Sequence, residues 1–430
     1  MKVAVIGAGI VGVTTAYELA ADGHAVTVFE RRGSVAEETS FANAGVVAPG
    51  YVTPWAAPGM PAKVLGHLLS RHAPVSLARP WARGQLGWMW RWWRACQPAV
   101  WQANRGHMHR LAHYSRARLL ALSAELQLEH EQARGYMVLL RTAKDQALAR
   151  AGLKLLAELG VKFHLVDAAR ARQIEPGLNA DTPLHAAVHL PDDLVGNCRQ
   201  FAHLLRGEAQ RLGAVFRFQR RITALAAGAA PTLQHQASDG PEHGQAQTEG
   251  FDAIVVCAAL GAPALLRPLG LKLPLVAVHG YSITAPLRQL DNHPDLGPRA
   301  AVMDEKYKVA ISRLGQRVRV AGSAELGGRL DQHRPGAIAT LYKVLDDWFP
   351  GCAQLAQVQQ WKGARPMLPD GPPVLGASGR DGIWLNLGHG SSGWALSCGS
   401  ARILADQLAG RSPAIGTDGL GLARLQRPAG

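Results

Sequence analysis

The sequence predicts an α/β protein with two parts: a parallel sheet assembled from several segments of the chain, and a discontinuous domain of antiparallel strands. Two patterns support this prediction. The first 30 residues read as strand, glycine-rich turn, helix and strand, which is the order of a βαβ unit with parallel strands. Residues 274–284 and 300–322 alternate apolar and polar side chains, which is typical of antiparallel strands.

The expected elements follow from local patterns in chain order. Residues 2–6 (KVAVI) are apolar enough for a strand that is buried on both faces of a parallel sheet. A turn at 7–12 leads into a helix at 13–21, which ends before Gly23. Later expected elements are helices at 145–159, 197–212 and 394–409, strands at 25–30, 161–165, 215–218, 253–257 and 383–387, and a hairpin within 222–257.

Composition excludes several classes of protein. The 430 residues are 47% hydrophobic and 18% charged, as in a soluble globular protein. The five cysteines are far apart without a CxxC pair, which argues against a zinc ribbon, an iron–sulfur cluster or a disulfide framework. His109 and His113 have no companion acid, so no metal site is expected. No apolar run approaches about 20 residues, so we expect no spanning helix.

The net charge of +14 comes mainly from one region. Between Thr39 and Ala124 there is no acidic residue, whereas the same region contains Lys63, Arg71, Arg79, Arg83, Arg91, Arg94, Arg105, Arg110, Arg116 and Arg118. Within this region, residues 81–101 contain six of the eleven tryptophans: Trp81, Trp88, Trp90, Trp92, Trp93 and Trp101. Such a stretch either packs as a core helix or contacts an anionic membrane surface. Nucleic acid is not expected, because no recognised binding module accompanies the patch.

The turn Gly7-Ala8-Gly9-Ile10-Val11-Gly12 matches the GxGxxG pattern of a Rossmann-like dinucleotide site. Gly7 permits the tight turn, Gly9 allows a pyrophosphate to approach, and Gly12 allows close helix–strand packing. The N–H groups of the first helical turn then face the phosphates. Glu30 ends the next strand, where it is placed to accept hydrogen bonds from a ribose. The pattern fits NAD and FAD equally.

A second match, Gly388-His389-Gly390-Ser391-Ser392-Gly393, also lies between a strand and a helix. No further strand with a terminal acid follows it, so a second dinucleotide site is not expected. A helix N-terminus can instead place its positive end near the pyrimidine side of a flavin, or simply begin a core helix.

Several blocks together closely resemble the bacterial D-amino acid dehydrogenases, which belong to the FAD-dependent glycine oxidase and D-amino acid oxidase group. They are GAGIVG, Glu30 and residues 38–61, 307–313, 364–376 and 385–411. The resemblance implies an FAD-binding domain from 1–60, 145–262 and 360–430. It implies a substrate-binding domain from 61–144 and 263–359.

The resemblance also implies which residues contact FAD. Ser40, Asn43, Ala44 and Gly45 are expected along the pyrophosphate and flavin ring, and residues 388–393 at its N1–C2 edge. Val3, Arg31, Ala258 and Gly261 complete the expected set. Leu368 lies near the position where relatives carry a tethering cysteine, and 40–45 contain no histidine, so noncovalent FAD is expected.

An amino acid substrate needs a cation for its carboxylate, and arginine can bind both oxygens. The family pattern favours Arg313, with Tyr281 and Tyr307 as hydroxyl donors and Arg365 as a second anchor. The expected activity is oxidation of D-amino acids to 2-oxo acids and ammonia, with electrons passed to a quinone or another carrier. The alternatives are a sarcosine, glycine, D-proline or hydroxyproline oxidoreductase, or an electron-relay flavoprotein subunit.

The expected location is the cytoplasmic side of the inner membrane, as a peripheral protein, or the cytoplasm itself. A homo- or hetero-oligomer is compatible with this expectation.

Overall fold

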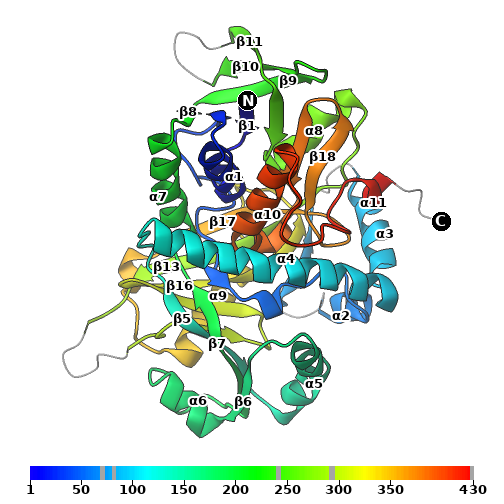
Figure 1. Cartoon of the computed structure of the whole chain (residues 1–430). Coiled ribbons are helices and arrows are strands. Elements are labelled where there is room, and N and C mark those ends of the chain that lie inside the picture. The colour runs from blue at the N-terminus through cyan, green and yellow to red at the C-terminus, as the bar shows by residue number, and fades with distance from the viewer. Residues whose placement is uncertain (68–72, 80–83, 239–243, 290–295, 427–430) are drawn as a thin grey trace.

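Two large sheets form the molecule, one above the other in Figure 1, with the long helix α4 (Pro98–Glu125) crossing between them. The computed structural model describes residues 1–67, 73–79, 84–238, 244–289 and 296–426. A separate three-stranded sheet lies at the top of the same view.

The upper sheet has six strands in the order β18-β19-β12-β1-β2-β8, drawn from the beginning, middle and end of the chain. All of its neighbours pair in parallel except β18 with β19. This confirms the predicted Rossmann-like fold. The strand bounds are β1 (Lys2–Ile6), β2 (Ala25–Phe29), β8 (Val215–Arg217), β12 (Ala253–Val256), β18 (Val374–Arg380) and β19 (Ile383–Leu387).

Residues 3–6 of strand β1 are apolar and buried, and both faces of the sheet are covered here. Val3 and Val5 pack into one hydrophobic cluster with helices α1 (Ile10–Ala21) and α10 (Gly393–Leu408). Ala4 and Ile6 pack into another cluster on the opposite face. The second cluster includes residues of the small sheet, whose strands are β9 (Arg220–Ala226), β10 (Thr232–Ala237) and β11 (Ala246–Gly250). The hairpin expected within 222–257 is therefore a three-stranded meander.

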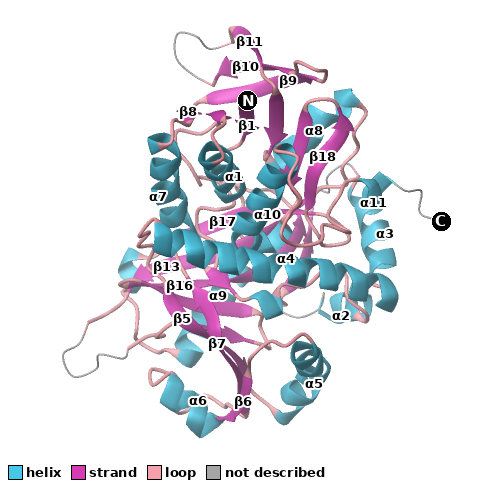
Figure 2. Ribbon diagram, viewed as in Figure 1, coloured by secondary structure: helices cyan, strands magenta, loops and turns pink. Residues whose placement is uncertain are grey.

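The lower sheet has ten strands and is largely antiparallel (Figure 2). One of its faces packs against helix α9 (Pro335–Trp348), with Ile283, Val318 and Val320 in that core. The strands are β3 (Val46–Val47), β4 (Val75–Ala78), β5 (Ala133–Leu140), β6 (His164–Asp167), β7 (Ala186–Val195), β13 (Val276–Pro286), β14 (Ala301–Asp304), β15 (Val309–Leu314), β16 (Arg317–Gly327) and β17 (Gln359–Met367).

The pairing of strands and the packing of helices differ in several places from the expected domain boundaries. Within 145–262, strands β6 and β7 pair in the lower sheet, and the chain returns to the upper part at helix α7. Conversely, α4 was expected in the substrate-binding domain, yet it packs with α1 and α10 beside the upper sheet. Amphipathic patterns identify a buried face but not the sheet that buries it, which is why sequence alone did not place these segments.

The remaining helices cover the sheets and connect them. Local side chains cap the N-termini of some of these helices. Thr142 and Asp145 form a capping box for α5, and Asn197 caps α7. The bounds are α1 (Ile10–Ala21), α2 (Met60–His67), α3 (Gln85–Ala95), α5 (Ala143–Glu158), α6 (Ala168–Ile174), α7 (Cys198–Arg211), α8 (Ala262–Leu266), α10 (Gly393–Leu408) and α11 (Ala423–Gln426).

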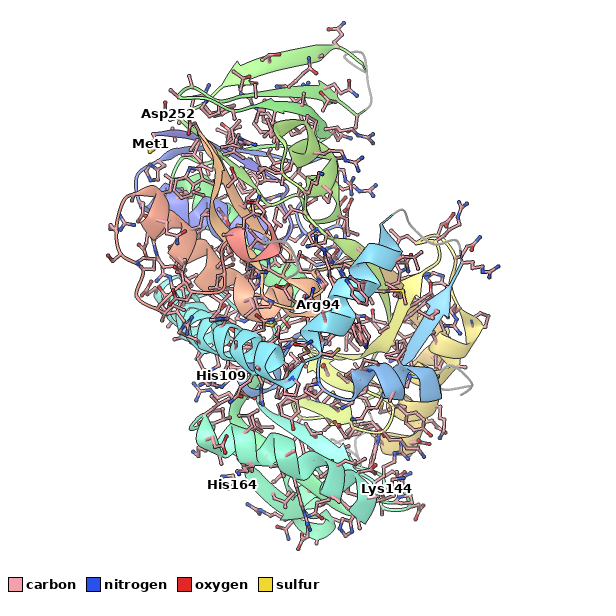
Figure 3. All side chains as sticks on the ribbon, turned by 90° about the vertical axis from the view of Figure 1, so that its right-hand side faces the viewer. Met1, Arg94, His109, Lys144, His164 and Asp252 are labelled. Atoms are coloured by element: carbon pink, nitrogen blue, oxygen red, sulfur yellow. The ribbon has the colours of Figure 1, made fainter. Side chains whose placement is uncertain are left out.

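Helix α3 divides its tryptophans between two faces. Trp88 is buried, and its indole N–H donates to the carbonyl of Met367 at 3.0 Å. Trp92 packs against the hydrophobic cluster that contains Trp88 and Met367. Trp90 and Trp93 are instead more than half exposed and stack on each other. Figure 3 labels Arg94, which lies in the last turn of α3. Trp81, Arg71 and Arg83 lie outside the described residues. Among the described helices, none is long and apolar enough to cross a membrane.

A buried carboxyl group where α4 meets β7 makes stability depend on pH. Asp193 is 2% exposed and pairs with Arg116 of α4 at 3.1 Å, and within the described ranges its other oxygen has no hydrogen-bond partner. Burial raises the pKa of Asp193 from 3.8 to about 7, although Arg116 opposes the shift. Between these pH values the unfolded chain ionises first, so this group lowers stability as pH rises from about 4 to about 7.

We therefore expect Asp193→Asn to stabilise the protein more at pH 8 than at pH 5. The difference between variant and wild type in the free energy of unfolding should grow by about 2 kcal/mol across this interval. Urea unfolding at the two pH values measures it. A difference that is independent of pH would contradict the assignment.

Candidate functional site

A cavity of about 430 Å³ opens at the carboxyl ends of β1, β2, β12 and β19. The N-termini of α1 and α10 reach it from one side, and β9 borders it on another. Thirteen of the predicted cofactor residues line this cavity: Gly7, Gly9, Ile10, Val11, Glu30, Arg31, Ser40, Ala258, Gly261, Gly388, His389, Gly390 and Gly393. The structure thus brings together both glycine motifs, which are about 380 residues apart.

The backbone of the first glycine turn can be formed only with glycine at Gly7 and Gly12. Gly7 has a φ of +102°, and a Cβ on Gly12 would lie 1.8 Å from the carbonyl oxygen of Gly7. At Gly9, by contrast, a Cβ would meet only the Ser40 hydroxyl, at 3.6 Å. Gly9 also precedes α1 without a side-chain cap, so its open side faces the cavity. This arrangement can accept a pyrophosphate at the helix N-terminus.

Glu30 braces this turn from the end of β2. Its two carboxylate oxygens accept the N–H groups of Ala8, at 2.7 Å, and Arg32, at 2.8 Å. Burial raises the pKa of Glu30, and these two N–H donors limit the rise. The carboxylate still borders the cavity, and each oxygen retains acceptor capacity for a ribose hydroxyl.

The second glycine motif places the N-terminus of α10 in the cavity. His389 is 3% exposed, and burial lowers its pKa to about 3, so the ring is neutral. The Ser400 hydroxyl donates to the Ser397 carbonyl and therefore accepts from His389 Nε2, which carries the proton. His389 is held as a neutral donor, so the positive potential here is that of the helix itself.

The side-chain oxygen of Asn386 in the cavity wall has no hydrogen-bond partner among the described residues. The Asn386 side chain is fully buried, and its amide nitrogen donates to Thr15 at 2.9 Å. Among the described residues its oxygen, Oδ1, accepts no hydrogen bond. Asn386 lines the cavity, so a bound group that donates there would satisfy it. The cradle of glycines, the open helix N-termini and this acceptor together fit a dinucleotide cofactor.

The other predicted cofactor residues do not line the cavity. Val3 is buried in the core near the start of β1, and Ala8 is buried within the glycine turn. Gly12 packs against the Gly7 carbonyl, and Ser391 is exposed just before α10. Asn43, Ala44 and Gly45 pass between α10 and the lower sheet, and the Trp394 indole donates to the Gly45 carbonyl at 3.1 Å.

The four residues that were predicted to bind substrate do not all lie on the same face of the lower sheet. Ser282 and Ser312 point toward residues 42–45, because their hydroxyls donate to carbonyls of that segment. Neighbouring residues on a strand face opposite sides. Tyr281 accordingly packs on the α9 face, where its hydroxyl donates to Glu325 at 2.7 Å. Arg313 also points to that side, and its Nε donates to the Gly315 carbonyl. Tyr307 packs on the same core, with the Arg141 guanidinium 5.3 Å from its ring.

Arg365 is the candidate that lies on the cavity side. In the pairing of β17 with β13, Arg365 lies opposite Val278. Its guanidinium occupies the space beside Gly280, where a Cβ would lie only 2.2 Å from it. Its Nη1 donates to carbonyls of His279 and Ser323, and the described residues include no carboxylate paired with it. Burial lowers its pKa to about 10, so it remains cationic at neutral pH. Pro366, the next residue, lines the cavity.

Sequence reasoning missed several residues of the wall. Residues 220–223 of β9 border the cavity without any recognisable motif, because the small sheet reaches it only through the tertiary fold. Asn386 had a readable signal: a polar side chain in the apolar strand IWLNL, directly before the second glycine motif. Thr39 lines the cavity and donates to the Ala364 carbonyl at 2.7 Å, which ties this loop to β17 beside Arg365.

Comparison with known proteins agrees with this geometry. Residues 2–407 match the family described as FAD dependent oxidoreductase. D-amino acid dehydrogenase from Rhizorhabdus wittichii is 40% identical over 426 residues, covering 99% of this chain and 100% of that protein. D-amino acid dehydrogenase from Cereibacter sphaeroides is 41% identical over 433 residues, covering 100% and 96%. Glycine oxidase from Geobacillus kaustophilus has a similar fold, with a TM-score of 0.76 at 20% identity, covering 100% and 99% of the two chains.

Proposed function

Because this chain belongs to the FAD-dependent oxidoreductase family, we propose that it is a D-amino acid dehydrogenase. It oxidises a D-amino acid to the imino acid, which water hydrolyses to a 2-oxo acid and ammonia. Bound FAD supplies the acceptor for the hydride that leaves Cα, and its electrons pass on to a quinone or another carrier. The observation that carries the proposal is the position of Arg365, which has no carboxylate partner among the described residues, beside a cavity that fits a dinucleotide.

The chain's own groups divide the work of holding FAD. Gly7, Gly9 and the first turn of α1 would hold the pyrophosphate, and Glu30 the adenosine ribose. The N-terminus of α10 would face the pyrimidine edge of the flavin, where its positive end favours negative charge.

Arg365 is the residue that we assign to the substrate carboxylate, in place of Arg313. Its guanidinium is fixed by two backbone carbonyls and lies 5.6 Å from the ring of Trp55, so its orientation is set before substrate binds. A cation crowded by protein atoms and lacking a carboxylate gains most from an anionic ligand. Arg313, Tyr281 and Tyr307 instead hold the opposite face of the sheet.

A panel of D- and L-amino acids with an artificial dye acceptor tests the activity, with oxygen consumption recorded alongside. We expect D-amino acids to reduce the dye, little oxygen uptake, and no turnover of the L-enantiomers. Turnover of sarcosine, glycine or D-proline in preference to other D-amino acids would favour an oxidoreductase of that kind. Turnover of no amine would favour an electron-relay subunit.

The flavin should be bound without a covalent link. The cysteine and the histidine in the cavity wall are Cys257 and His389, as far as the structure is described. Burial raises the pKa of Cys257 to about 12, and His389 is engaged with Ser400. We expect acid or heat to release all flavin into the supernatant as FAD, measured by fluorescence. Yellow colour that stays with the precipitate would contradict this expectation.

We further propose that the protein binds an anionic membrane surface peripherally through α3. Leu86, Trp90 and Trp93 lie on one helical face and are 66%, 57% and 51% exposed; we call them the tryptophan ridge. The ridge lies within the segment 39–124, which has ten cations and no acid, and Arg91 beside it is exposed. Exposed indoles with a nearby exposed cation favour the interface of an anionic bilayer.

Replacing Trp90 and Trp93 together by Ser should weaken binding to anionic liposomes about tenfold, because both interfacial rings are lost. Sedimentation with and without anionic lipid, at low and high salt, measures this effect, and binding should fall as salt rises. Leu148→Ser is the matched control, since Leu148 is also 66% exposed but lies on α5. Absence of binding by the wild type under every condition would indicate a soluble cytoplasmic protein.

A further inference from the structure

Four consecutive backbone carbonyls, those of residues 42–45, are all bound by side chains from distant parts of the chain. The donors come from three strands of the lower sheet and from α10. The pairs are Ser282 Oγ to Ala42 at 2.8 Å, Arg319 Nη1 to Asn43 at 3.1 Å, Ser312 Oγ to Ala44 at 2.8 Å, and Trp394 Nε1 to Gly45 at 3.1 Å. We call this arrangement the carbonyl clasp.

The register of the sheet accounts for the three donors on strands. Arg319 on β16 lies opposite Ser312 on β15 and opposite Thr284 on β13. Directly opposed residues project from the same face of a sheet. Ser282 and Thr284 share that face on β13 because they are two residues apart. The three strand donors of the clasp therefore form one row of polar side chains that faces residues 42–45.

Arg319 is the unusual member of the row. It is 5% exposed, and its Nε donates to the Thr284 hydroxyl at 2.9 Å. In the described part of the chain it forms no ion pair with a carboxylate. Burial lowers the pKa of Arg319 to about 10, so it is cationic at neutral pH. A buried cation that binds only neutral oxygens is costly, and here it fixes one peptide carbonyl with a charge-assisted hydrogen bond.

The clasp determines where the peptide N–H groups of the segment point. In a trans peptide the N–H lies opposite the preceding carbonyl. The carbonyls of Ala42 and Asn43 point to the sheet, so the N–H groups of Asn43 and Ala44 point away from it. Among the described residues neither N–H has an acceptor, whereas the Gly45 N–H donates to Asn43 Oδ1. The segment also contacts Trp394 in the first turn of α10, which begins in the cavity wall at Gly393.

We propose that Arg319 is a positioning residue for the flavin: through the Asn43 carbonyl it holds the N–H groups of Asn43 and Ala44 ready for acceptor atoms of the ring. Ser282 and Ser312 support the neighbouring peptides in the same orientation. This inference rests on FAD binding and is independent of which amine is the substrate.

Three variants separate the carbonyl contact from the charge. Arg319→Met removes both, Arg319→Gln keeps a donor without charge, and Arg319→Lys keeps the charge with a shorter reach. We expect Arg319→Met to weaken FAD binding about tenfold or more and to change the visible flavin spectrum. The same variant should lower the midpoint potential of the flavin, because donors to the ring favour its reduced form. Gln and Lys should recover part of the affinity and of the spectrum. Titration of apoprotein with FAD and a spectroelectrochemical titration measure these effects without substrate.

Arg317→Met is the matched control. Arg317 is two residues away on β16, but it pairs with Glu131 at 2.7 Å and its side chain is 41% exposed. Its loss should leave the FAD dissociation constant and spectrum unchanged. A folded Arg319→Met protein with wild-type affinity, spectrum and potential would overturn the proposal, as would a Gln variant as impaired as Met. If Arg319→Met does not fold, the Ser282→Ala/Ser312→Ala double variant should shift the spectrum in the same direction, and an unchanged spectrum there would also overturn it.

Discussion

Gly9→Val should yield folded protein that retains almost no FAD. A Cβ at this position meets only the Ser40 hydroxyl, at 3.6 Å, and the backbone of Gly9 is ordinary extended chain, so the fold should tolerate the change. The valine methyl groups would instead occupy the place where the pyrophosphate approaches α1. We expect FAD affinity to fall by about two orders of magnitude or more. Flavin absorbance after gel filtration, together with far-UV circular dichroism, measures both parts of the prediction.

Gly33→Val provides the control for this experiment. Gly33 is exposed, follows the same strand β2, and has open space around its position. That variant should remain yellow. Full FAD occupancy in Gly9→Val would show that the phosphate does not approach this turn, and the cofactor assignment of the cavity would fail.

Arg365→Leu should lower kcat/KM for a D-amino acid about 100-fold while FAD stays bound. Loss of a charge-assisted clamp on the substrate carboxylate costs about 3 kcal/mol in a site shielded from water. Most of the effect should be in KM, because the carboxylate is held in the ground state as well as in the transition state. Arg365→Lys should recover part of the loss, since it keeps the charge but not the fork.

Arg313→Leu is the matched comparison, because this arginine was the first choice from family resemblance. On the opposite face of the sheet it contacts the Gly315 carbonyl, so its loss should change kcat/KM by only a few-fold. A severe loss for Arg313→Leu beside near-normal kinetics for Arg365→Leu would reverse the assignment of the anchor.

The parts of the structure that sequence predicted are those encoded locally. The run KVAVI, the GxGxxG turn and Glu30 lie within one βαβ unit, so each supports the interpretation of the others. The second glycine motif was predicted near the first only through family resemblance, because about 380 residues separate them.

The choice between Arg313 and Arg365 depended on a signal that the sequence does contain. In β15, Arg313 lies on the same side of the strand as Val309 and Ile311, because these residues are separated by steps of two. Val309 and Ile311 are both fully buried against α9. Alternation alone therefore places Arg313 on the core side and Ser312 on the other. What alternation does not reveal is which face of the sheet meets the cofactor domain, since that depends on how the two sheets pack.

Arg319 shows the limit of such reasoning. Its strand reads as alternating arginine and valine, which is typical of a sheet with one solvated face. The side chain is instead buried, because residues 42–45, far away in the sequence, cover it. The burial of Arg319 and its place in the carbonyl clasp depend on tertiary contacts, so the pattern of the strand does not predict them.

An anaerobic titration of the purified holoprotein tests the central claim most directly. Substrate is added without any electron acceptor, and the visible absorbance of the oxidised flavin is followed. We predict that D-alanine bleaches the flavin, whereas L-alanine and sarcosine leave it oxidised. Bleaching by sarcosine or L-alanine with none by D-alanine would contradict the account.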